Sequence, residues 1–266
     1  MDQGHRLAAI VEYDGTDYAG WQSQEHSESI QDLVQGALSF VAGEPVVAIC
    51  AGRTDSGVHA IGQVIHFDTQ AARTPRAWVL GANTKLPPAI ALQWAGEVSS
   101  GFHARHQAIR RIYRYCILNR SERSGLQRAR AAWIHRPLDA VAMHAAAQAL
   151  IGEHDFSAFR SIQCQSKTPV RRVARIDVRR EGDYVWLEIE ANAYLHHMVR
   201  NIVGTLIAVQ RESDAPGAMA RVLAGSDRRF AGATAPPAGR YLWRVDYPPI
   251  YAIPTLQSAP LLPPSG

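Results

Sequence analysis

The sequence predicts an α+β protein made of two α/β halves, each with the βαββαβ element order of the split β-α-β sandwich. Apolar residues at helical spacing alternate with short β-forming runs, and this order occurs twice although no sequence repeat is visible. The 266 residues suit one large domain or two small ones. A composition of 47% hydrophobic and 20% charged residues is ordinary for a folded chain.

In the first half we expect four strands and two helices. The first strand ends at the turn signal Asp14-Gly15, and the first helix has one apolar face and a stop at Gly43. The expected elements are strand 7–14, helix 29–41, strands 46–51 and 64–67, helix 76–85 and strand 90–98.

The second half has a similar order. Asp139 is the expected N-cap of its first helix and Gly152 the stop. The expected elements are strand 109–118, helix 139–151, strands 173–179 and 184–193, helix 197–209 and strand 242–247. We therefore expect domains at 1–105 and 106–250 and a Pro-rich surface tail at 251–266.

Several protein classes are excluded by what the sequence lacks. No run of about 18 apolar residues predicts a spanning helix, and the N-terminus has no secretory pattern. Three lone cysteines favour a reduced, cytoplasmic compartment. Phosphate-binding glycine loops, a nucleophile elbow and His-Glu-x-x-His are absent. No carboxylate completes a metal set with the histidine pairs 103/106 or 196/197, so no metal is expected.

The positive charge is concentrated in the middle of the chain. Residues 101–180 carry 16 Lys/Arg against 5 Asp/Glu, a net of +11, whereas the whole chain is only +4. All but two of its 28 cations are arginines, which suit phosphate and base contacts. A GC-rich genome that prefers Arg codons, with a solvated basic face, is the alternative interpretation.

The segment 52–60, Gly-Arg-Thr-Asp-Ser-Gly-Val-His-Ala, lies between two expected strands and is the first candidate for chemistry. Arg53 and Asp55 can converge on one site there. The alternative is a tight turn in which Asp55 caps its own backbone and Arg53 is solvated. In the segment 13–22, aromatics between glycines suit base stacking, although aromatics folded onto the core are the favoured interpretation.

Two further segments carry polar side chains with a pattern. On the strand at 110–115, Tyr113 and Tyr115 share a face beside Arg111, which suits a nucleotide, whereas an edge strand protected by cations is the alternative. Arg200 lies off the apolar stripe near a helix start, where a cation opposes the macrodipole and can hold an anion. Its alternative is an earlier helix start with Arg200 merely exposed.

Taken together, these segments resemble the tRNA pseudouridine synthase A family. Six of them follow in the family's order between about residue 7 and about residue 248, namely 13–22, 52–60, 102–105, 111–115, 155–160 and 196–204. Three residues depart from the family pattern: Ser56 replaces an alanine, Arg111 a lysine and Arg240 an apolar residue. The resemblance implies two ferredoxin-like halves whose antiparallel and mixed sheets join into one extended sheet with a central basic cleft.

The resemblance also implies a function, namely isomerisation of uridine to pseudouridine at positions 38, 39 and 40 of the tRNA anticodon stem-loop. It implies a homodimer that binds tRNA, with no cofactor, no metal and no membrane. Asp55 is then the nucleophile in the N-terminal domain, and Arg200 pairs with it. Tyr113 lies against the target base, Arg53 fills the space that the flipped base leaves, and Leu242 is a weaker candidate for the pocket wall. The RNA-binding residues expected in the Arg-rich C-terminal domain are Arg110, Arg111, Arg114, Arg160 and His196.

Physical chemistry agrees with this function. The reaction breaks the N1–C1′ bond, turns the base and joins C5 to C1′, so nothing is lost and no redox partner is needed. An ionised carboxylate can attack either C1′ of the ribose or C6 of the base, after the base has been flipped out of its stem. Asp55 or Tyr113 can take the C5 proton. The rival functions are an RNA-binding module without catalysis and a small-molecule hydrolase or lyase.

Overall fold

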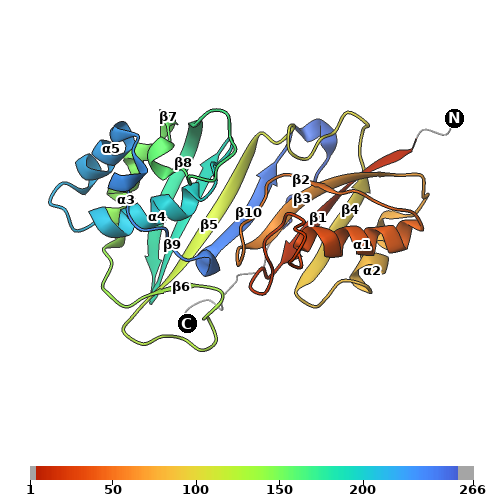
Figure 1. Ribbon diagram of the computed structural model, residues 1–266, viewed down its shortest axis with the longest axis horizontal. Helices are drawn as coiled ribbons and strands as arrows, with labels where there is room; N and C mark the ends of the chain where they lie inside the picture. The colour runs from red at the N-terminus through yellow and green to blue at the C-terminus, as the bar shows by residue number, and fades with distance from the viewer. Residues whose placement is uncertain (1–3, 257–266) are drawn as a thin grey trace. The chain divides into compact units, whose positions relative to one another are not determined.

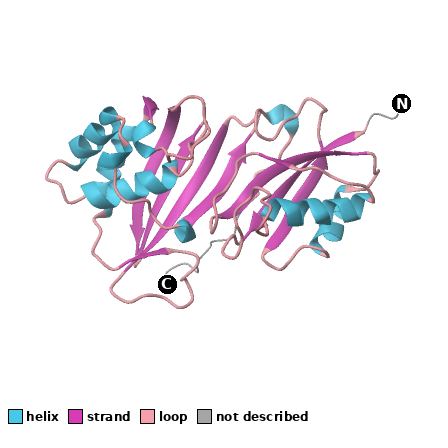
Figure 2. Cartoon of the chain, in the orientation of Figure 1, coloured by secondary structure: helices cyan, strands magenta, loops and turns pink. Residues whose placement is uncertain are grey.

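The computed structural model describes residues 4–256, which form ten strands and five α-helices in two compact units (Figures 1 and 2). Of the described residues, 4–109 and 241–256 make the first unit and 110–240 the second. Most strand pairs are antiparallel, so the expected α+β class is confirmed. Residues 257–266 of the expected Pro-rich tail lie outside the described residues.

The sheet of the first unit has the strand order β4-β1-β3-β10, with β2 paired to β3. β1 is antiparallel to both β3 and β4, whereas β10 runs parallel to β3. The strand bounds are β1 His5–Tyr13, β2 Ile49–Cys50, β3 His59–Thr69, β4 Ile90–Glu97 and β10 Arg240–Asp246. β10, which the sequence places at the end of the second half, thus returns to the strand that follows segment 52–60.

Two helices cover this sheet, α1 (Ile30–Ala42) and α2 (Pro75–Asn83) (Figure 1). Ser29 caps α1 by accepting the amide of Asp32, and Gly43 ends the helix as expected. Trp78 of α2 is fully buried, with its ring 5.1 Å from that of Phe67 on β3. The buried side chains of each helix, Ile30, Val34 and Leu38 of α1 and Trp78 of α2, therefore hold it on the sheet.

The second unit has the antiparallel strand order β5-β9-β8-β7, and β6 pairs with β5 in parallel. Its strands are β5 Arg110–Asn119, β6 Ala132–Ile134, β7 Gly152–Asp155, β8 Val170–Glu181 and β9 Tyr184–Ala191. Its helices are α3 Ala140–Ala147, α4 Met198–Val209 and α5 Ala215–Gly225. α3 packs against β8 and α5. Among the residues that the structure describes, no helix combines the length and apolar character needed to cross a membrane.

Some element boundaries differ from the sequence expectation. The strand expected at 46–51 is only two residues long: Ile49 and Cys50 pair with His66 and Ile65 of β3. The helix expected at 139–151 leaves the α form after Ala147, and Gly152 opens β7 instead of ending a helix. α5 was not expected at all, since Pro216 and Gly217 in its first turn hide the helical pattern.

A buried histidine joins β3 to the segment 102–106 of the first unit. His66 is 3% exposed, and its Nδ1 accepts the backbone N–H of Ala104 at 3.2 Å. The rings of His66 and His103 lie 4.6 Å apart. Burial, reinforced by nearby His103 and Arg6, lowers the pKa of His66 to about 4. His66 is therefore neutral at pH 7, and its ring nitrogen is available as an acceptor.

We expect His66 to make the protein sensitive to acid. An unfolded histidine titrates near pH 6.5, so between about pH 6.5 and about pH 4 the unfolded chain binds a proton that the folded chain does not. The free energy of unfolding then falls as the pH falls through this window, by at most about 1.4 kcal/mol per pH unit from this group. Urea unfolding across the window measures the effect.

The variant His66→Gln keeps an acceptor for the amide of Ala104 but has no titration, so its unfolding free energy should fall less steeply with acid. The control is His26→Gln, which changes an exposed histidine of the same unit. A slope for His66→Gln equal to that of the native protein would contradict the assignment.

Candidate active site

The loop between β2 and β3 is held at its beginning by one buried glutamine. Gln63 of β3 is fully buried, and its Nε2 donates to the carbonyl of Gly52 at 2.6 Å. Its Oε1 accepts the amide of the same residue at 3.3 Å. A third bond from Nε2 reaches the hydroxyl of Tyr13 on β1 at 3.4 Å. These hydrogen bonds fix the backbone of the loop at the point where it leaves the sheet.

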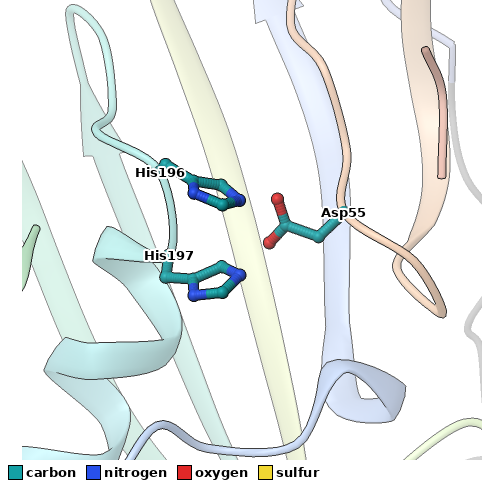
Figure 3. A group of neighbouring side chains, drawn as sticks. All are labelled: Asp55, His196 and His197. Carbon is teal, nitrogen blue, oxygen red and sulfur yellow. The ribbon is translucent and has the colours of Figure 1, made fainter. Parts of the chain in front are cut away.

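The middle of the loop is fixed by Thr54, which points inward. Its hydroxyl lies 2.8 Å from that of Tyr13, and its carbonyl accepts the amide of Trp21 at 3.0 Å. Because Thr54 is buried, its two neighbours point outward: Arg53 is exposed and Asp55 is partly exposed. The Asp55 carboxylate points away from its loop (Figure 3).

A second loop, at 14–21, lies directly on the first, and two of its glycines permit this approach. A Cβ on Gly15 would meet the carbonyl oxygen of Val58 at 2.0 Å. Gly20 has φ +96°, and a Cβ there would lie 2.5 Å from the carbonyl oxygen of Thr54. Both positions therefore require glycine. The buried rings of Tyr18 and Trp21 fold onto the core, which is the favoured interpretation of this loop, and do not form a stacking surface.

The end of the loop is tied to β10 through His59. Its ring stacks on Tyr241 at 4.7 Å, and its Nδ1 lies 3.1 Å from both Asp14 Oδ1 and the amide of Gly15. The close contact with the His59 ring, followed by the hydrogen bonds from Thr16, holds the pKa of Asp14 well below its usual range. Leu242, the next residue of β10, pairs with Ala60 and is fully buried.

In the second unit, Tyr113 lies on the buried face of β5 among polar neighbours. The guanidinium of Arg240 stacks over its ring at 4.3 Å, and the ring of Tyr194 meets it edge-on at 4.8 Å. Tyr194 donates to the carbonyls of Ile189 and Arg111, and burial raises its pKa far above the usual value. Arg111 is itself buried and donates to the carbonyl of Asn192 at 2.8 Å. Tyr113, which is expected to face the target base, therefore packs against the guanidinium of Arg240.

Arg110 and Arg114 lie on the opposite face of β5 from Tyr113. Arg110 pairs with Glu190 at 2.6 Å, and Arg114 pairs with Glu188 at 2.7 Å. Glu190 and Glu188 are on the neighbouring strand β9. These ion pairs compensate the two charges locally, so the net charge of segment 101–180 overstates the charge that this face offers to RNA. The RNA-binding role of the two arginines stays a prediction.

Arg160 and His196 meet at one short loop of the second unit. Arg160 donates to the carbonyls of Cys164 and Ser166 at 2.7 and 2.9 Å, which orders the loop. The sulfur of Cys164 accepts the amide of His196 at 3.4 Å. The pKa of this thiol is lowered: burial alone would raise it, but the amides of His196 and Ser166 and nearby Arg160 stabilise the thiolate.

α4 begins two residues after His196. The rings of His196 and His197 lie 4.0 Å apart before the first turn, and His197 has a left-handed φ of 62° (Figure 3). Arg200 falls in the first turn, as expected from its place off the stripe, so the alternative of an earlier helix start is wrong. Its Nε donates to the carbonyl of Ala235 at 2.7 Å, which aims the guanidinium.

The class of protein follows from a comparison with known families. The family model described as tRNA pseudouridine synthase matches residues 9–107 and 146–248, which include the loop of Asp55 and the beginning of α4 but not β5 with Tyr113. The chain belongs to the tRNA pseudouridine synthase family, whose members are isomerases.

Curated relatives give a finer likeness. The chain is 52% identical over 256 residues to the tRNA pseudouridine synthase A of Shewanella sp. (strain MR-7), and the match covers 96% of this chain and 98% of the relative. With the same coverage, it is 52% identical to the protein of that name from Shewanella baltica (strain OS155) and 51% identical to that from Idiomarina loihiensis.

Sequence reasoning missed the side chains that hold the two loops together. Gln63 directly precedes the short strand expected at 64–67, whereas β3 in fact begins at His59, so its place inside a buried strand was not expected. Buried polar groups of this kind must be hydrogen-bonded. Arg240 was noted only as a departure from the family pattern, and nothing in the sequence indicates that it stacks on Tyr113.

We expect Gln63→Leu to lower the free energy of unfolding by about 2 to 3 kcal/mol, because it leaves the amide and carbonyl of Gly52 without their buried partner. Chemical denaturation measures this loss. The control is Gln165→Leu, which changes an exposed glutamine and should stay within about 0.5 kcal/mol of the native protein. Equal stability of the two variants would show that Gln63 does not hold the loop.

Proposed function

We propose that this protein converts uridine to pseudouridine at positions 38, 39 and 40 in the anticodon stem-loop of tRNA, with Asp55 as the nucleophile. Membership of the tRNA pseudouridine synthase family supports the reaction class and the tRNA substrate. The observation that carries the role of Asp55 is the loop: Thr54 and Gln63 are anchored in the interior, so the carboxylate is presented outward from a rigid backbone. The anticodon positions rest on the resemblance.

The proposed reaction needs one carboxylate and several positioning groups. Breaking the N1–C1′ bond frees the uracil, which turns and rejoins through C5, and the C5 proton then leaves. Asp55 attacks C1′ of the ribose and is displaced when C5 joins C1′, or it attacks C6 of the base and is expelled when the C5 proton leaves. In both routes N1 gains a proton as C5 loses one, so the product is an isomer of the substrate. Asp55 or Tyr113 removes the proton, directly or through water.

The target uridine lies within a stem and must be flipped out before attack, at a cost of a few kcal/mol. We propose that Tyr113 contacts the extruded uracil and recovers part of this cost. Arg53, which is exposed beside Asp55, fills the vacated space in the stem. Arg200 pairs with the carboxylate and keeps it ionised at neutral pH. Leu242 contributes an apolar wall.

The remaining parts of the proposal concern assembly. We propose a homodimer with one tRNA spanning both subunits, in which residues 1–105 carry the catalytic loop and the Arg-rich residues 106–250 bind RNA. Arg111, Arg160 and His196 are the proposed RNA contacts on the side of Tyr113 and α4. A cytoplasmic location stays a prediction.

We expect Asp55→Asn to abolish turnover, by at least about 10³-fold, while tRNA still binds, because the amide keeps the shape of the carboxylate but is not a nucleophile. The assay is tritium release from C5-tritiated uridine in transcribed tRNA, beside a filter-binding measurement. The matched control is Asp17→Asn, an exposed carboxylate on the neighbouring loop, which should retain native turnover.

Two outcomes would favour the rival functions. Binding of tRNA by the native protein without tritium release would indicate an RNA-binding module. Turnover of free uridine or uridine monophosphate, with binding that hardly depends on salt, would indicate a small-molecule enzyme, because contacts to RNA phosphates weaken steeply as salt rises.

Arg200→Ala should lower kcat by about 10²-fold and change the tRNA dissociation constant by less than about 3-fold, since its guanidinium acts on the reacting carboxylate. The control is Arg221→Ala on α5, which removes an exposed arginine and should change neither quantity. Steady-state kinetics and binding separate the two effects. Equal losses in turnover and affinity would assign Arg200 to RNA binding alone.

A further inference from the structure

A pocket of about 460 Å³ lies entirely within the second unit, beside the beginning of α4. Its polar lining comes from three stretches of chain: Ser161 and Gln163, His197 and Asn201, and Arg228 and Thr234. The volume falls within the range of small-ligand sites. The proposed roles of the family residues use His196 and Arg200 but leave this pocket unassigned.

Arg228 is held in the pocket by neutral oxygens only. It donates to the carbonyl of Ala231 at 3.2 Å, to Oδ1 of Asn201 at 3.2 Å and to the hydroxyl of Thr234 at 3.0 Å. Asn201 is 1% exposed, and it is fixed in turn by its bond to the carbonyl of Phe159 at 2.8 Å. The guanidinium is therefore oriented before any ligand arrives.

No carboxylate among residues 4–256 forms an ion pair with Arg228. The next residue provides the contrast, because Arg229 pairs with Asp227 at 2.6 Å through its Nη2 and shares further bonds with it. Of these two adjacent arginines, Arg229 is neutralised by a carboxylate, whereas Arg228 lines the pocket with its positive charge uncompensated. An oriented and uncompensated guanidinium is the group that best matches a phosphate.

The other wall of the pocket also favours an anion. His197 opens α4 in a left-handed conformation, which costs a non-glycine residue energy and is typical of functional sites. The positive end of the macrodipole of this 12-residue helix lies at the start of α4, where His197 and Asn201 line the pocket. Ile162, 99% exposed at the rim, adds an apolar surface that a sugar or base can cover.

We propose that this pocket binds one nucleotide of the RNA strand, with its phosphodiester on Arg228 and its ribose and base in the remaining volume. The inference rests on the proposed function, since it assumes an RNA substrate. It adds a binding residue remote in sequence from Asp55 and Tyr113, and it assigns Arg228 to affinity and not to chemistry.

The test compares Arg228→Gln with the matched control Arg229→Gln, using transcribed tRNA over a series of salt concentrations. Loss of one phosphate contact should reduce the slope of log K against log salt by about 0.7 to 0.9, and the dissociation constant at fixed salt should rise by about 10-fold. Turnover at saturating tRNA should stay within about 2-fold of native. Arg229→Gln should leave slope and affinity unchanged.

A third variant separates charge from structure. Arg228→Lys keeps the charge but loses the forked bonds, so it should recover most of the slope even where its melting temperature falls as far as that of Arg228→Gln. An unchanged slope in Arg228→Gln, with only a lower melting temperature, would overturn the proposal. A second result would also overturn it, namely that the native protein binds inorganic phosphate and Arg228→Gln does not, although both proteins show the same salt slope for tRNA.

Failure of the proposed function gives a different result. If the native protein binds tRNA but releases no tritium, and Arg228→Gln still reduces the slope, then the pocket binds RNA and the isomerase is wrong. If tritium is released and the slope is unchanged, the isomerase stands and the pocket proposal is wrong.

Discussion

The close approach of two backbone loops in the first unit is the constraint on which the candidate catalytic site depends. The carbonyl of Thr54 accepts the amide of Trp21 on the neighbouring loop. The two loops can approach this closely because residue 20 is a glycine and has no Cβ. Thr54 is thereby turned inward, and the residues on either side of it are turned outward. This backbone arrangement presents the carboxylate of Asp55 outward from the loop. A carboxylate held in this way loses little conformational freedom when a substrate arrives.

The second unit shows that net charge and available charge differ. Most of the chain's excess of arginine lies in this unit, yet Arg110 and Arg114 are matched by glutamates on the next strand. Arg240 lies over the ring of Tyr113. Arg228, by contrast, is held only by neutral acceptors, which leaves its charge to a ligand. The placement of partners, and not the number of arginines, decides where an RNA phosphate can bind.

Most of the fold could be predicted from the sequence because its helices and strands have clear periodicity, as in α1 with its Ser29 cap and Gly43 stop. α5 escaped because Pro and Gly occupy its first turn. In the site, the segment around Asp55 was recognisable from its residues and their order. The side chains that hold this segment, Gln63 and Tyr13, were not recognisable. The pairing of β1 with β3 brings them to the loop, and a local sequence pattern does not indicate which residues of two strands pair.

The central claim is that Asp55 forms a bond to the target uridine, and a trapped complex tests it most directly. In tRNA transcribed with 5-fluorouridine, the fluorine at C5 cannot leave as a proton does, so the reaction stops before its last step. Mass spectrometry of peptides from the complex then locates the bond. At the point of arrest C1′ is already joined to C5, so for attack at C6 the account predicts a nucleotide on the peptide that contains Asp55. For attack at C1′ it predicts a released C5-fluorinated nucleotide with a C5–C1′ bond, whose formation Asp55→Asn abolishes. A nucleotide attached to a different residue would contradict it.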